Sequence, residues 1–145
     1  MLLYHGAMNA TLRGRLAELL SAEPDIEAAW LVGSHARGQA RPDSDVDVAV
    51  LFRAGDGDPF AEALRRGALV DSLEGGLHLP VDVLDIEEVS PAVFAVSMRG
   101  AVLLLDRNRG RRIDVASRRY AEWHDMQPHY EMQRQGVRAY FSPRG

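Results

Sequence analysis

Two apolar segments with the character of β-strands, residues 27–33 (EAAWLVG) and 46–52 (VDVAVLF), are joined by the short link 34–45. A parallel crossover needs a helix of about a dozen residues or more, plus loops at both ends. The link is too short for that, so the sequence does not favour a simple doubly wound parallel sheet. We therefore expect a mixed sheet on which helices pack.

The rest of the chain supplies further alternating elements. Ser90 and Asp58 are typical helix caps, and prolines stand in the first turns that follow them. The expected elements are helices at 9–22 (capped by Asn9 or Thr11), 59–73, 90–98 and 111–140, the last broken at Pro128, and strands at 80–86 and 101–106. The expected fold class is α+β: about four strands in a small mixed sheet, with helices packed on it and a C-terminal helical tail.

Composition limits the remaining possibilities. The 145 residues are 46% hydrophobic, which suits one domain over 1–145, with a core at about 9–106 and a helical region at about 111–140. No apolar run approaches the roughly 18–20 residues of a membrane span, and the N-terminus does not resemble a signal peptide, so we expect a cytoplasmic protein. A net charge of −4 argues against direct binding of nucleic acid. Cysteine and lysine are both absent, which excludes thiolate and Schiff-base chemistry.

Asp45 and Asp47 stand at the start of an apolar strand segment. Residues two apart share a face of a strand, so the two carboxylates should lie close enough to repel each other. A divalent cation would remove this repulsion, and oxygen ligands suit Mg²⁺ or Mn²⁺. The alternative is that both are solvated acids in a turn, with Ser44 as a local hydrogen-bonding partner.

Gly33 and Ser34 follow the preceding strand segment. A glycine here lets a ligand approach the backbone closely, and a short helix over 34–38 would offer free N–H groups to an anion. Arg37 could then reach a phosphate. The alternative is a simple turn after the strand. Taken together with the aspartates, the pattern indicates phosphoryl or nucleotidyl transfer with a metal ion.

The string GSHARGQARPDSDVDVAVLF, with Gly33-Ser34 and Asp45-x-Asp47, resembles the motif of the polymerase-β-like nucleotidyltransferase superfamily. It is most similar to the minimal nucleotidyltransferases, many of which are MntA-type antitoxins paired with HEPN-domain toxins. The resemblance implies a third carboxylate on a later strand. Asp82 is the candidate, and Asp85, at the end of that strand, is the competitor.

The resemblance also implies an activity and a partner. ATP would be the substrate, with Mg²⁺ or Mn²⁺ held by Asp45, Asp47 and Asp82. Asp82 would help to hold the metal nearest the acceptor or would take the proton from the acceptor hydroxyl. The phosphates would lie on Gly33 and Ser34, while Arg37 steadies the triphosphate and Ser44 braces the loop. The acceptor would be a hydroxyl, that of a tyrosine, on a HEPN ribonuclease toxin. An antitoxin that only binds its toxin, and a nucleotidyltransferase for a small molecule such as an aminoglycoside, remain as alternatives.

The sequence does not decide the roles of two further features, an arginine-rich segment and a histidine. Six arginines between residues 107 and 119 could form a docking patch or a solvated helix face. His35, inside the motif, could touch phosphate or be an ordinary exposed residue.

Overall fold

Four strands form one mixed sheet in the computed structural model, which describes residues 2–141 and, within them, the side chains of 11–129, 131 and 132. The sheet order is β3-β2-β1-β4, where the strands are β1 (Ile26–Val32), β2 (Val46–Phe52), β3 (Val81–Asp85) and β4 (Val102–Asp106). β1 is antiparallel to both of its neighbours, and β2 is parallel to β3. The antiparallel β1–β2 pair confirms the inference from the short link, and the α+β class is confirmed with it.

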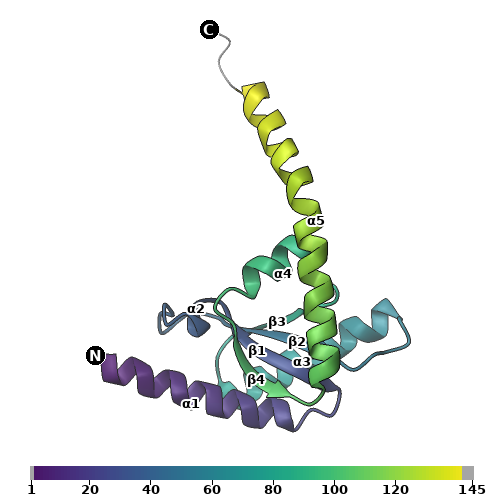
Figure 1. Ribbon diagram of the computed structural model, residues 1–145. Helices are drawn as coiled ribbons and strands as arrows, with labels where there is room; N and C mark the ends of the chain where they lie inside the picture. Colours follow the sequence, from purple (N-terminus) through teal and green to yellow (C-terminus); the bar gives the residue numbers. More distant parts are fainter. Residues whose placement is uncertain (1, 142–145) are drawn as a thin grey trace.

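Helices cover both faces of this sheet (Figure 1). They are α1 (Leu2–Ser21), α2 (Gly33–Ala36), α3 (Pro59–Leu77), α4 (Pro91–Ser97) and α5 (Arg109–Phe141). Because helices pack on both sides, all residues of β1 except Glu27 are buried, which explains why its sequence is almost continuously apolar. The second half of α5 extends away from the sheet (Figure 1).

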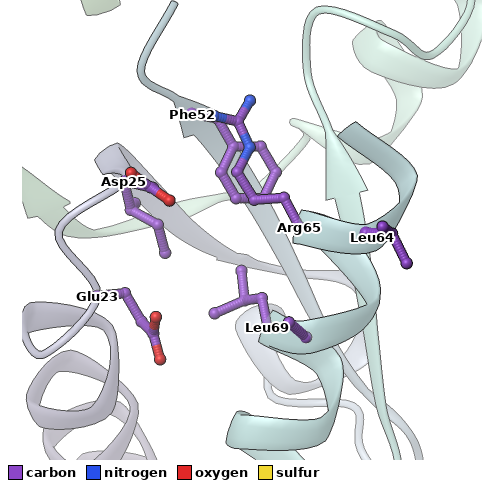
Figure 2. A pocket seen from close by; sticks show the side chains of 8 residues that line it. Glu23, Asp25, Phe52, Leu64, Arg65 and Leu69 are labelled. Atoms are coloured by element: carbon purple, nitrogen blue, oxygen red, sulfur yellow. The ribbon is translucent and has the colours of Figure 1, made fainter. Parts of the chain in front are cut away.

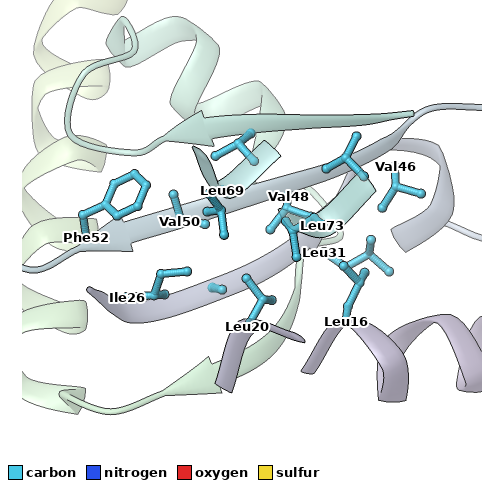
Figure 3. Packing of buried hydrophobic residues seen from close by; sticks show 13 residues of the cluster. Leu16, Leu20, Ile26, Leu31, Val46, Val48, Val50, Phe52, Leu69 and Leu73 are labelled. Carbon is cyan, nitrogen blue, oxygen red and sulfur yellow. The ribbon is translucent and has the colours of Figure 1, made fainter. Parts of the chain in front are cut away.

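The face beneath α1 and α3 holds the larger apolar cluster. Every second residue of β2, starting at Val46, points into it. The helices contribute fully or almost fully buried leucines, and Figure 3 shows how they meet the strands: Leu16 and Leu20 from α1, Leu69 and Leu73 from α3. The opposite face carries a second cluster, in which Phe94 of α4 and Val115 of α5 pack over Trp30 and Ala49. The residues of β2 that alternate with Val46 and Val48, Asp47 among them, therefore belong to the α4–α5 face.

Two of the expected helix boundaries were wrong. α1 begins at Leu2 rather than near residue 9, so Asn9 and Thr11 lie inside the helix and do not cap it. No proline occurs in the chain before Pro24, so no residue of this type prevents the helix from extending toward the N-terminus. The expected break at Pro128 is also wrong, because α5 continues through it. Proline has no N–H, so the carbonyl one turn before Pro128 receives no helical hydrogen bond from it. Residues 127–129 are exposed, so water can take the place of that bond.

The caps of α3 and α4 are confirmed. The Asp58 carboxylate accepts a hydrogen bond from the Phe60 N–H at 3.0 Å, and the Ser90 hydroxyl accepts one from the Val93 N–H at 3.2 Å. Pro59 and Pro91 occupy the first helical positions, where no N–H is required.

Replacing Asp58 with alanine is expected to lower the free energy of unfolding by about 1 kcal/mol, because the first turn of α3 loses its side-chain acceptor. Asp58→Asn keeps an acceptor of equal capping strength and should lower it by only a few tenths. Urea denaturation of both variants checks this. Equal losses in the two variants would contradict the capping role.

The arginines between residues 107 and 119 mostly hold the fold together. Arg107 donates to three backbone carbonyls between α1 and β1. Arg111 pairs with Glu27 at 2.8 Å and with Glu87 at 2.6 Å, and it is three-quarters buried. Further ion pairs or hydrogen bonds are made by Arg112, Arg118 and Arg119. Most of these arginines therefore tie α5 to the sheet and to the segment that follows β3.

Candidate active site

Asp47 and Asp82 lie opposite each other on neighbouring strands. In the parallel pairing of β2 with β3, Asp47 is the register partner of Asp82. Both side chains belong to the α4–α5 face, since their neighbours Val46 and Val81 point into the α1–α3 cluster. Asp45 directly precedes β2, two residues from Asp47. Asp47 is half-buried, whereas Asp45 and Asp82 are exposed. The fold thus brings the three predicted carboxylates to one end of one face.

Gly33 is required by the position of Asp47. It directly follows Val32, the last residue of β1, whose register partner is Asp47. Gly33 has a φ of +73°, and a Cβ atom on it would lie 2.3 Å from the Asp47 Oδ2. Such a distance is impossible for a real side chain, and the left-handed backbone is itself unfavourable for other residues. The sequence predicted that a ligand could approach the Gly33 backbone closely. The structure shows in addition that the Asp47 carboxylate does so.

The loop between α2 and β2 is braced by side chains. The Ser44 hydroxyl accepts a hydrogen bond from the Arg41 N–H at 2.8 Å, which closes a turn directly before Asp45. His35 Nε2 lies 3.1 Å from the Ser44 carbonyl oxygen. Because a carbonyl oxygen can only accept, the Nε2 atom must carry the proton and donate it. Ser44 and His35 therefore set the entry to β2. The only signal for His35 in the sequence was its place inside the motif.

The pKa of Asp47 is raised above the ordinary aspartate value. Burial is the largest cause, followed by the negative charges of Asp82 and Asp45, while the positive charges of His35 and Arg37 lower it in part. The three carboxylates therefore act on one another electrostatically, and a cation among them would favour their ionised forms.

The chemistry of this donor set fits Mg²⁺ or Mn²⁺, since all three ligands are carboxylates and their mutual repulsion calls for a positive charge. Within the part of the chain that the structure describes, no three His, Cys, Asp or Glu side chains are already gathered into a metal-binding group. Closing such a group requires changes of rotamer, which are available to the exposed Asp45 and Asp82.

The residues predicted to meet phosphate lie beside this cluster. Ser34 is half-buried in α2, and its carbonyl accepts a hydrogen bond from the Gln39 N–H at 2.9 Å. Arg37 is exposed, and its positive charge reaches Asp47. The structure therefore brings all seven predicted site residues to the β1–α2–β2 corner and the adjacent start of β3.

Asp85, the competing third carboxylate, lies elsewhere. It shares the α1–α3 face with Val81 and Val83 and so points away from Asp47. An acid at the end of a strand is commonly exposed, but Asp85 is only 7% exposed, and its Oδ1 accepts a hydrogen bond from the Glu87 N–H at 2.9 Å. Burial raises the pKa of Asp85, and the Glu87 N–H bond and the Arg65 charge offset this only in part.

Asp85→Asn is expected to stabilise the fold at neutral pH. With its pKa raised on folding, Asp85 binds its proton more tightly in the folded state, so stability falls as pH rises from the ordinary aspartate pKa through the raised one. Asparagine removes this loss and keeps the Glu87 hydrogen bond, so the gain at about pH 7 should be on the order of 1 kcal/mol. Thermal denaturation as a function of pH measures it. A gain that persists at a pH where aspartate is protonated would contradict the explanation.

Cavities occur at the other end of β2. One of about 330 Å³ is lined by Phe52, Leu64, Arg65 and Leu69, with Glu23 and Asp25 at its border (Figure 2). A neighbouring cavity of about 310 Å³ shares Phe52 and Arg65, whose guanidinium lies 4.3 Å from the centre of the Phe52 ring. Both are remote from the carboxylates, so neither is a pocket for the reacting groups.

The fold and the site define a nucleotidyltransferase. The family model described as "Polymerase beta, Nucleotidyltransferase" matches residues 15–110, and the chain belongs to this family. Among curated proteins, no sequence matches significantly.

Several solved structures share the fold. A chain of a toxin–antitoxin crystal structure with AMP-PNP is 22% identical with a TM-score of 0.70, and the match covers 86% of this chain and 97% of the other. A chain from the structure of a tri-AMPylated Shewanella oneidensis HEPN toxin in complex with MNT antitoxin is 20% identical with a TM-score of 0.67, covering 89% and 98%. A structure named as a minimal nucleotidyltransferase is 33% identical with a TM-score of 0.51, covering 65% and 93%. No helix in the described part of the chain is both long enough and apolar enough to cross a membrane.

Proposed function

We propose that this nucleotidyltransferase moves AMP from ATP to a hydroxyl group of a HEPN-type toxin and acts as its antitoxin. The observation that carries the proposal is the meeting of Asp47 with Asp82 in register, with Asp45 beside them and a side-chain-free Gly33 against Asp47. The similarity to toxin–antitoxin structures, one of them with an AMPylated toxin, supports the choice of partner.

Asp45, Asp47 and Asp82 would hold Mg²⁺ or Mn²⁺, which neutralises phosphate charge and polarises the phosphorus under attack. Gly33 and Ser34 receive the phosphates, and Arg37 steadies the triphosphate through its charge. Asp82 accepts the proton of the attacking hydroxyl. The acceptor oxygen forms a bond to the α-phosphorus, the bond from that phosphorus to the bridging oxygen breaks, and pyrophosphate leaves.

We expect the acceptor hydroxyl to belong to a partner protein and not to a small molecule. Asp45 and Asp82 are exposed, so the carboxylate end of the sheet is open to solvent. The cavities described above lie at the far end of β2. A protein surface that presents a tyrosine hydroxyl can reach an open site of this kind, whereas a small molecule would normally be enclosed in a pocket.

Intact-mass spectrometry of the HEPN partner, incubated with this chain, ATP and Mg²⁺, tests the proposal. Mass steps of one AMP on the partner are expected, and they should disappear when the metal is chelated. A tight complex with no change of mass would instead indicate an antitoxin that only binds. No complex and no change of mass would indicate a small-molecule acceptor.

A further inference from the structure

The turn between α4 and β4 contacts the active site from a distant part of the sequence. Met98 directly follows α4 as its C-cap residue, and the Ala101 N–H donates back to the Met98 carbonyl at 3.2 Å. Gly100 within this turn has a φ of +71°. A Cβ atom on Gly100 would lie 3.1 Å from the Cγ of Arg37 and 3.8 Å from its Cδ. The aliphatic stem of Arg37 therefore lies so close that a side chain on residue 100 would press against it.

This contact matters because of where the charge of Arg37 acts. Arg37 follows α2 directly, and its positive charge reaches Asp47 although its side chain is exposed. A long exposed arginine samples many rotamers unless something restricts its stem, and losing that freedom opposes binding. Because residue 100 is glycine, the Arg37 stem can lie close beside the turn, and any side chain at residue 100 would crowd that stem.

We propose that Gly100 is a positioning residue that directs the Arg37 guanidinium to the triphosphate of ATP. The inference rests on the proposed function, because it takes ATP as the ligand of the Arg37 head. It links nucleotide affinity to α4 and its following turn, a segment outside the motif.

Gly57 provides a matched control for the test. It also has a positive φ, of +82°, but nothing lies within 4 Å of a Cβ placed on it. Gly57→Ala and Gly100→Ala therefore carry a similar backbone cost, and only the second crowds the stem of Arg37. Gly100→Asn and Gly57→Asn form a second pair, because asparagine tolerates this backbone conformation better than alanine does.

Calorimetric titration of ATP with Mg²⁺ is the measurement, with circular dichroism to confirm folding. We expect Gly100→Ala to weaken ATP binding about three- to tenfold, the loss of part of one charge-assisted contact, and Gly57→Ala to leave it unchanged. In transfer assays the KM for ATP should rise while kcat stays near that of the wild type. A merely structural role would lower the active fraction and leave KM unchanged.

A double-mutant cycle with Arg37→Ala decides whether Gly100 acts through Arg37. Once Arg37 is removed, Gly100→Ala should cause no further loss of ATP affinity. A loss that persists in the Arg37→Ala background, or equal effects at Gly57 and Gly100, would overturn the inference while leaving the proposed function intact. A wild-type chain that binds no ATP would overturn the proposed function and the inference with it.

Discussion

Replacing Asp47 with asparagine is expected to abolish AMP transfer while the chain still folds and binds its partner. Asp47 is the carboxylate on which the charges of both Asp45 and Asp82 act, and it lies directly against Gly33. Asparagine keeps the size of the side chain but removes the negative charge that would hold the metal. The rate of partner modification should fall by at least about 10²–10³-fold, as expected when a central electrostatic contact in a phosphoryl-transfer site is lost.

Asp43→Asn is the matched control, since Asp43 is an exposed aspartate in the loop that precedes β2 and the substitution changes the net charge equally. This variant should retain the wild-type rate within about twofold, the level at which screened surface charges act. Mass spectrometry over a time course measures both variants. If Asp47→Asn kept the wild-type rate, or if both variants lost activity equally, the assignment of Asp47 to the active site would be wrong.

Replacing Gly33 with alanine should remove activity and weaken the fold together. The alanine methyl would overlap the Asp47 Oδ2, so the carboxylate must turn away or β1 and β2 must move apart. The left-handed backbone at this position adds roughly 1–2 kcal/mol of strain. We expect transfer to fall to the level of Asp47→Asn, with a loss of unfolding free energy of about 1–3 kcal/mol.

Gly38 separates these two effects. Its φ of +69° matches that of Gly33, but nothing lies within 4 Å of a Cβ placed on it. Gly38→Ala should therefore show the loss of stability from strain and keep most of the activity. Urea denaturation and initial transfer rates measure the two properties. Similar activity in both variants would show that the approach of Gly33 to Asp47 is not needed for the reaction.

Local sequence was sufficient for most of the elements. The strand 46–52 coincides with β2, because its β-branched residues and its flanks of turn residues leave little choice. The caps at Asp58 and Ser90 followed from side chains that bond within their own first turn. The short β1–β2 link excluded a crossover. The expected break at Pro128 was wrong because residues 127–129 are exposed, so water can take the place of the missing hydrogen bond. The expected start of α1 was wrong because its pattern of leucines begins well inside the helix.

Only the tertiary structure decided which residues lie next to each site residue. The sequence contained Asp45, Asp47 and Asp82, but the β2–β3 register that sets Asp82 opposite Asp47 depends on packing between segments far apart in the chain. The same holds for Asp85, which is turned to the other face and buried beside α3, and for Gly100, which meets Arg37 across the fold. Motif residues lie close in sequence, so their chemistry can be recognised from type and spacing. Contacts between distant segments depend on which faces the hydrophobic core buries, and that is settled only when the whole sheet is packed.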